Sequence, residues 1–119
     1  MASKHTLVFT GYAVLLTYAS LRPAGTGSIE PWDKLAHLIA YAVFALLGRF
    51  VVEQKSAYVR LCCSIVLYGG AMEYLQSFMP GRVMSLGDLV ANTLGVLAAA
   101  LLLKNFTGKD QSTEPGDAA

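Results

Sequence analysis

Polar side chains that could do chemistry lie within the apolar segments of this chain. They are Asp33, Lys34, His37, Tyr41, Glu73, Gln76, Arg82, Ser85, Asp88 and Asn92. A charged side chain at the centre of a bilayer costs about 2.5–3.5 kcal/mol on insertion scales, so such residues usually mark a site or an internal network. His37 and Glu73 are the candidates for acid–base catalysis, because both side chains can exchange a proton. Together the ten residues are the candidates for a ligand-binding site.

The spacing of these residues predicts that they converge. At 3.6 residues per turn, Asp33, His37 and Tyr41 share one helical stripe. Glu73 and Gln76 share a second stripe, and residues 85, 88 and 92 form a third. With a rise of 1.5 Å per residue, the three stripes reach similar depths, roughly 6–12 Å from the same side. An unpaired charge in hydrocarbon is costly, so we expect the stripes to face one another.

Four apolar segments must position these residues. They span residues 6–21, 34–52, 57–79 and 86–103, each near the length of about 20 residues that a membrane-spanning helix needs. The chain has 119 residues, of which 55% are hydrophobic and 14% charged. This composition predicts an all-α polytopic membrane protein, a compact bundle of four transmembrane helices over residues 1–106. A polar tail over residues 107–119 is expected to be disordered and cytoplasmic.

The first segment also resembles a signal peptide, since Lys4 precedes a short apolar stretch and Ala19-Ser20 offers small residues. We favour a retained helix because three further segments follow it.

Basic residues predict the orientation. The predicted cytoplasmic side carries six of them: Lys4, Arg49, Lys55, Arg60, Lys104 and Lys109. The opposite side carries Arg22, Lys34 and Arg82. By the positive-inside rule, both termini are expected in the cytoplasm and the polar site on the outer face.

Small residues recur at every fourth position of the last segment, at Gly87, Ala91, Gly95 and Ala99. Such a stripe lets another helix approach closely. It lies beside Asp88, so close packing there would shield the polar site from lipid.

Other classes of function lack their signatures. The net charge is +1 and the basic residues are scattered, which gives no nucleic-acid-binding face. Cys62 and Cys63 are adjacent, and no Cys/His spacing typical of zinc is present, so we expect buried thiols and no metal or cofactor. No HExxH, GxSxG or phosphate-loop motif occurs.

Each candidate also has a structural interpretation. Asp33 could be a helix N-cap, and Ser85-x-x-Asp88 fits a capping box. His37 and the amides of Gln76 and Asn92 could be satisfied within a network between helices. Tyr41 could belong to the core, and Arg82 could contact ordinary lipid headgroups. Glu73 is the hardest to explain by structure alone, because it is the deepest acid.

Taken together, Asp33-Lys34-Leu35-Ala36-His37, Tyr41, Glu73-Tyr74-Leu75-Gln76, Pro80-Gly81-Arg82, Ser85, Asp88, Asn92 and Gly95 resemble the VanZ-like membrane protein family. The resemblance covers about residues 31–97. It implies a protein of the bacterial cytoplasmic membrane, with an envelope role and with resistance to glycopeptides such as teicoplanin in some members. It does not imply a particular reaction.

Three functions are compatible with these features. The leading hypothesis is recognition of an extracytoplasmic envelope ligand, such as a lipid-linked precursor or a glycopeptide. An intramembrane enzyme acting on a lipid-linked precursor is the second, although Ser85 is the only poised hydroxyl. The third is a structural or interaction role. The sequence predicts the lipid bilayer as a partner and identifies no protein partner. Proton-linked transport lacks an acidic chain through the inner halves of the helices.

Overall fold

The chain folds into four helices. The computed structural model describes residues 3–21, 30–80 and 85–112, with side chains given outside 30–33 and 105–112. Helix α1 spans Lys4–Leu21, α2 spans Glu30–Arg49, α3 spans Lys55–Gln76 and α4 spans Leu86–Ser112. The all-α prediction is therefore confirmed for the described residues.

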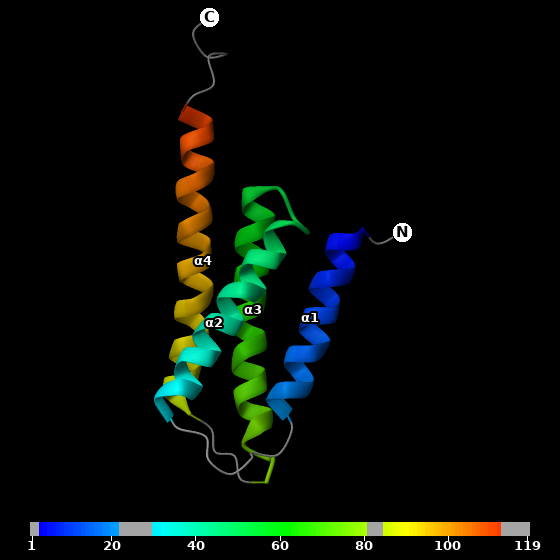
Figure 1. Cartoon of the computed structure of the whole chain (residues 1–119), viewed down its shortest axis with the longest axis vertical. Coiled ribbons are helices and arrows are strands. Elements are labelled where there is room, and N and C mark those ends of the chain that lie inside the picture. The colour runs from blue at the N-terminus through cyan, green and yellow to red at the C-terminus, as the bar shows by residue number, and fades with distance from the viewer. Residues whose placement is uncertain (1–2, 22–29, 81–84, 113–119) are drawn as a thin grey trace, which may run out of the picture.

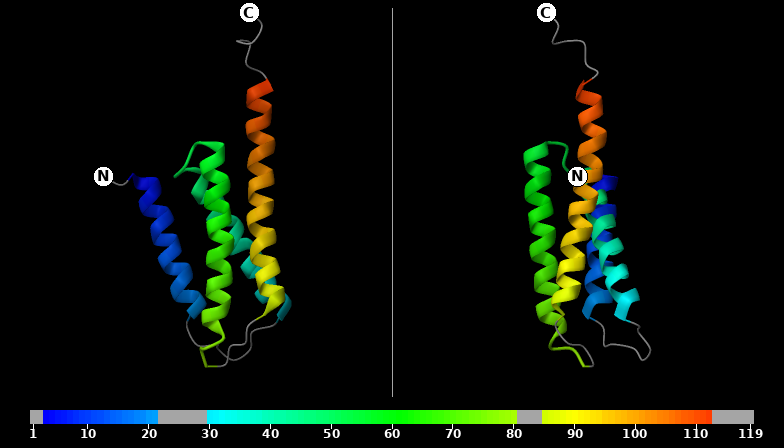
Figure 2. Two further views of the ribbon diagram at one scale, coloured as in Figure 1. Left: turned by 180° about the vertical axis from the view of Figure 1, so that it is seen from behind. Right: turned by 90° about the vertical axis from the view of Figure 1, so that its left-hand side faces the viewer.

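The helices run up and down beside one another (Figure 1). Helices α2 and α3 lie between α1 on one side and α4 on the other, and α4 extends beyond its neighbours toward the C-terminus (Figure 2). The start of α2, the end of α3 and the start of α4 therefore lie at the same end of the bundle (Figure 1). This end carries the polar residues.

Helices α2 and α4 pack most closely because of the small-residue stripe. Ala91, Gly95 and Ala99 are buried along it. A Cβ added to Gly95 would collide with the carbonyl oxygen of Leu38 and approach the backbone nitrogen of Ala42 to 3.0 Å. The contact is between two backbones, which only glycine permits at this spacing. The close approach expected from the sequence is thus made with α2.

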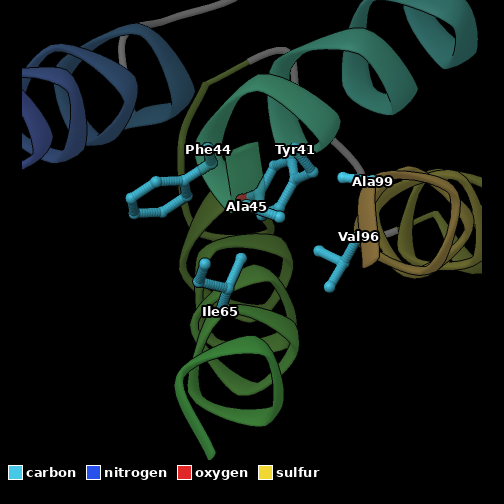
Figure 3. Packing of buried hydrophobic residues seen from close by; sticks show 6 residues of the cluster. All are labelled: Tyr41, Phe44, Ala45, Ile65, Val96 and Ala99. Carbon is cyan, nitrogen blue, oxygen red and sulfur yellow. The ribbon is translucent and has the colours of Figure 1, made fainter. Parts of the chain in front are cut away.

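The hydrophobic core lies further along the bundle from the polar end. It consists of Tyr41, Phe44, Ala45, Ile65, Val96 and Ala99 from α2, α3 and α4 (Figure 3). Helix α1 adds partly buried side chains such as Phe9 and Tyr12, whose rings lie 4.9 and 5.5 Å from that of Phe44. Aromatic packing thus connects α1 to the core.

Tyrosine hydroxyls join the helices by hydrogen bonds to backbone carbonyls. Tyr12 donates to the carbonyl oxygen of Ala40 at 2.5 Å, linking α1 to α2. Tyr58 donates to that of Ala45 at 2.8 Å, linking α3 to α2. In an apolar bundle such bonds satisfy the hydroxyl and fix the relative positions of the helices.

Helix boundaries differ from the predicted segments by a few residues at most positions, but α4 is longer. It remains helical to Ser112, whereas the last apolar segment was expected to end at Leu103 and a tail to begin at Thr107. Residues 113–119 lie outside the described residues, as does the predicted loop at 22–28.

The prediction of four transmembrane helices needs correction. Among the described residues, one helix is long and apolar enough to cross a membrane, at Leu86–Lys104 of α4. The polar residues of the other helices explain the difference. Helix α1 includes Lys4 and His5, α2 has charges at both ends, and α3 carries Arg60 and Glu73. The side chains that mark the candidate site thus make α2 and α3 less apolar.

Candidate functional site

Six of the predicted residues come together at one end of the bundle. We define them as the polar cluster: Lys34, His37, Glu73, Ser85, Asp88 and Asn92. They come from the first half of α2, the last turn of α3 and the start of α4 (Figure 1). The predicted convergence of three helical stripes is found for these residues.

Both ring nitrogens of His37 face side chains of α4. Its Nδ1 lies 2.9 Å from Oδ1 of Asn92, a hydrogen bond between α2 and α4. An amide oxygen can only accept, so Nδ1 carries the proton and donates. In the neutral ring Nε2 then has a lone pair, and it lies 3.7 Å from Oδ2 of Asp88. The ring is therefore oriented by Asn92, and Nε2 faces a carboxylate.

Lys34 reaches across the start of α4 to the other oxygen of Asp88. Its Nζ lies 3.9 Å from Oδ1, and the Lys34 side chain is 44% exposed while that of Asp88 is 18% exposed. The lysine passes over Gly87, where an added Cβ would approach Lys34 Cε to 2.5 Å. Gly87 thus leaves room for the ion pair at the accessible rim of the polar cluster.

Ser85 caps α4, as the sequence predicted. Its Oγ accepts a hydrogen bond from the backbone N–H of Asp88 at 3.2 Å, and its carbonyl oxygen accepts from that of Leu89. In a capping box the acidic residue three positions on would bind the backbone N–H of Ser85 in return. Here that N–H donates instead to Oε2 of Glu73 on α3, at 3.1 Å. The carboxylate of Asp88 instead faces Lys34 and His37.

Glu73 and Asn92 are the most enclosed polar residues of the cluster. Their exposed fractions are 1% and 2%. Asn92 lies against a glycine of α3: a Cβ added at Gly69 would approach Asn92 Nδ2 to 3.2 Å. A glycine on α3 therefore lets the amide of α4 lie between the helices. The inner part of the cluster is shielded and the Lys34 side is accessible.

Two predicted site residues lie outside the polar cluster and contribute to packing between helices. Tyr41 is 2% exposed and belongs to the core, with its ring centroid 6.3 Å from those of Phe44 and Tyr68. Gln76 donates from Nε2 to the carbonyl oxygen of Ser20 at 2.8 Å, close to the end of α1. It therefore satisfies a carbonyl of the last turn of α1, which has lost its helical partner. No pattern in the sequence pointed to Ser20.

For two other predicted site residues, Asp33 and Arg82, the structure does not describe the side chain. Helix α2 begins at Glu30, so Asp33 lies within its first turn and not at its N-cap. The side chain of Asp33 and all of Arg82 lie outside the described residues.

The arrangement can hold a cation, although the sequence indicated no metal. One ligand atom each from His37, Glu73 and Asp88 lies within 4.8 Å of the other two. The spacing of residues in the sequence could not predict this group of ligands, because the three residues come from three different helices. An imidazole with two carboxylates can also exchange protons or accept hydrogen bonds from a bound ligand.

Comparison with known proteins gives the family. No curated protein and no solved structure matches the chain. A model of the VanZ/LLP1 family matches residues 3–107, which include α1, α2, α3, most of α4 and the polar cluster. Only 28% of the apolar stretch Leu86–Lys104 is buried within the bundle, unlike the core helix of a soluble protein. This stretch and the family match are consistent with a membrane protein. The extent of the match, over most of the chain, shows that the protein belongs to the VanZ/LLP1 family.

Proposed function

We propose that this protein recognises a charged molecule of the bacterial cell envelope at its polar cluster and thereby supports resistance to glycopeptides such as teicoplanin. The observation that carries the proposal is the contact of Asp88 with both Lys34 and His37, at 3.9 and 3.7 Å. These are charged or titratable groups from two helices, gathered at one end of an apolar bundle. Keeping them there is costly unless they serve a site or a network.

The graded exposure of the cluster supports a binding role. Lys34 is accessible at the rim, His37 and Asp88 are about one-fifth exposed, and Glu73 is enclosed beneath them. A ligand headgroup can therefore reach the lysine first and the imidazole next. An anionic headgroup such as a phosphate or a carboxylate would pair with Lys34 and accept hydrogen bonds.

The orientation belongs to the same proposal. Helix α4 crosses the cytoplasmic membrane, with Lys104 on the cytoplasmic side and the polar cluster at the outer face. Basic residues near the end of a membrane span favour the cytoplasm. Exposed apolar side chains along α4 face the lipid: Leu86, Val90, Leu94, Leu97, Leu101 and Leu102.

The test is teicoplanin susceptibility in cells that lack the protein and are complemented with wild type or His37→Ala. Membrane abundance is measured in parallel. We expect His37→Ala to reach normal abundance and fail to restore resistance, because Asp88 and Asn92 lose their shared partner. Resistance that falls only in proportion to abundance would instead make the cluster a structural network.

The chain offers a matched control in its other histidine. His5 is exposed near the start of α1, and its ring stacks on Phe50 with a centroid distance of 5.5 Å. It lies at the opposite end of the bundle from the polar cluster (Figure 1). His5→Ala should restore resistance fully. Equal failure of both variants would contradict a specific role for the cluster.

The enclosed carboxylate beside His37 also favours a second candidate, an enzyme that acts on a lipid-linked envelope precursor. A buried acid near an imidazole is an arrangement that general acid–base catalysis uses. Incubation of purified protein with such a precursor separates the two functions. An enzyme forms product, and Glu73→Gln abolishes that product without abolishing binding.

A further inference from the structure

The geometry points to a divalent metal site formed by His37, Glu73 and Asp88, one residue from each of α2, α3 and α4. Their ligand atoms all lie within 4.8 Å of one another. The inference rests on these positions alone. It does not depend on the resistance role, so either can fail without the other.

One of the distances is close to that between two ligands of a single ion. Nε2 of His37 and Oδ2 of Asp88 are 3.7 Å apart, too far for a direct hydrogen bond. Two ligands at about 2.1 Å from a tetrahedral metal lie about 3.4 Å from each other. Small side-chain shifts therefore bring these two atoms onto one ion. The ligand atom of Glu73 lies within 4.8 Å of both, on the third helix α3.

The hydrogen bond that orients the imidazole is of the kind that metal-bound histidines make. Its Nδ1 donates to Oδ1 of Asn92, so the lone pair of the neutral ring is on Nε2. Metal-bound histidines usually donate their second nitrogen to a carboxylate or carbonyl oxygen, which fixes the tautomer and the ring orientation. Asn92 is 2% exposed and serves this purpose here as a positioning residue.

The ligand types select the metal. One imidazole nitrogen with two carboxylate oxygens suits Zn²⁺ or Mn²⁺, whereas thiolate-preferring ions would lack their ligands here. Three protein ligands leave a coordination position open, as in catalytic zinc sites. An anionic headgroup that enters beside the exposed Lys34 could occupy it.

The experiment measures metal binding by the purified full-length protein in detergent. After chelation and dialysis, Zn²⁺ and Mn²⁺ are titrated separately by calorimetry, and bound metal per chain is determined by elemental analysis. We expect one equivalent of at least one of these ions. Loss of an outer partner of a metal ligand typically costs about 10–100-fold in affinity. Glu73→Gln and Asp88→Asn each replace a charged carboxylate ligand with a neutral amide, so they should weaken binding more than tenfold.

A second measurement needs no site variant, and so does not depend on whether Glu73→Gln folds. The chain has two histidines, so His5→Ala leaves His37 as the only imidazole. Nitrogen NMR of this variant should show the Nε2 resonance of His37 shifting on addition of Zn²⁺, while Nδ1 keeps its proton. The site would be overturned by two results together: an Nε2 resonance that does not shift at saturating Zn²⁺, and calorimetry that detects no bound equivalent of Mn²⁺.

Discussion

The carboxylate of Glu73 on α3 accepts a hydrogen bond from the backbone N–H of Ser85, 3.1 Å away at the start of α4. This N–H is one that a capping box would satisfy within α4 itself. The bond therefore ties two helices together at the residue where one of them begins. It also leaves Asp88, the acid of the expected capping box, to contact Lys34 and His37.

Stability should depend on an acceptor at position 73 more than on its charge. Glu73→Gln keeps an oxygen that can accept from Ser85 N–H, so we expect the folded bundle to survive. Glu73→Ala leaves this N–H without its partner and should lose about 1–3 kcal/mol of unfolding free energy. Denaturant unfolding in detergent, followed by circular dichroism, measures the difference. Equal losses in both variants would contradict the role of the hydrogen bond.

Much of the site was predictable because it depends on local periodicity. The stripes at 33, 37 and 41 and at 85, 88 and 92 follow from 3.6 residues per turn, and the cap at Ser85 follows from residue type. The separation of Gln76 from the cluster was not predictable. It depends on the end of α1 lying beside α3, where Ser20 offers a carbonyl oxygen at 2.8 Å.

The hydrogen bond between Glu73 and the backbone of Ser85 could not be predicted, for a similar reason. A sequence shows that Ser85 and Asp88 are three positions apart, but the approach of the end of α3 is a matter of tertiary packing. The span count was overestimated because length and overall composition were considered before the charges within each helix. Arg60 and Glu73 lie inside α3 and make it less apolar than α4.

The position of the Lys34 amine should matter for resistance, not only its charge. Gly87→Ala changes no charge, yet its Cβ would approach Lys34 Cε to 2.5 Å and push the side chain away from Asp88. We expect Gly87→Ala and Lys34→Gln both to lower teicoplanin resistance at normal membrane abundance. Susceptibility assays with abundance measurements test this.

Another glycine provides the control for this prediction. At Gly70 an added Cβ meets only ordinary contact, with Leu89 Cδ1 at 3.8 Å. Gly70→Ala should leave resistance unchanged. If Gly87→Ala also behaves as wild type while Lys34→Gln does not, charge alone is needed and the observed position of the lysine is not.

The two ends of the bundle should differ in their access to a membrane-impermeant maleimide. Starting from a variant with Cys62→Ser and Cys63→Ser, Met79→Cys places a thiol near the polar cluster and Lys104→Cys places one near the other end of α4. Under the proposed orientation, Met79→Cys is labelled in intact spheroplasts and Lys104→Cys only after lysis. The reverse pattern would place the polar cluster in the cytoplasm.

The contact between α2 and α4 should be the least tolerant of added volume. At Gly95 a Cβ would collide with the backbone carbonyl of Leu38, which cannot move aside as a side chain can. Gly95→Ala must therefore push the helices apart, and overpacking of this kind typically costs about 1–3 kcal/mol.

At Gly11 of α1, a Cβ would meet nothing within 4 Å. Alanine is better than glycine in a helix by up to about 1 kcal/mol, so Gly11→Ala should leave stability unchanged or raise it. Thermal unfolding of both variants in the same detergent gives the comparison.

Because α2 and α4 carry His37 and Asn92, Gly95→Ala should also separate the imidazole ring of His37 from the amide of Asn92 that orients it. A Gly95→Ala variant as stable as Gly11→Ala would show that the close backbone contact is dispensable.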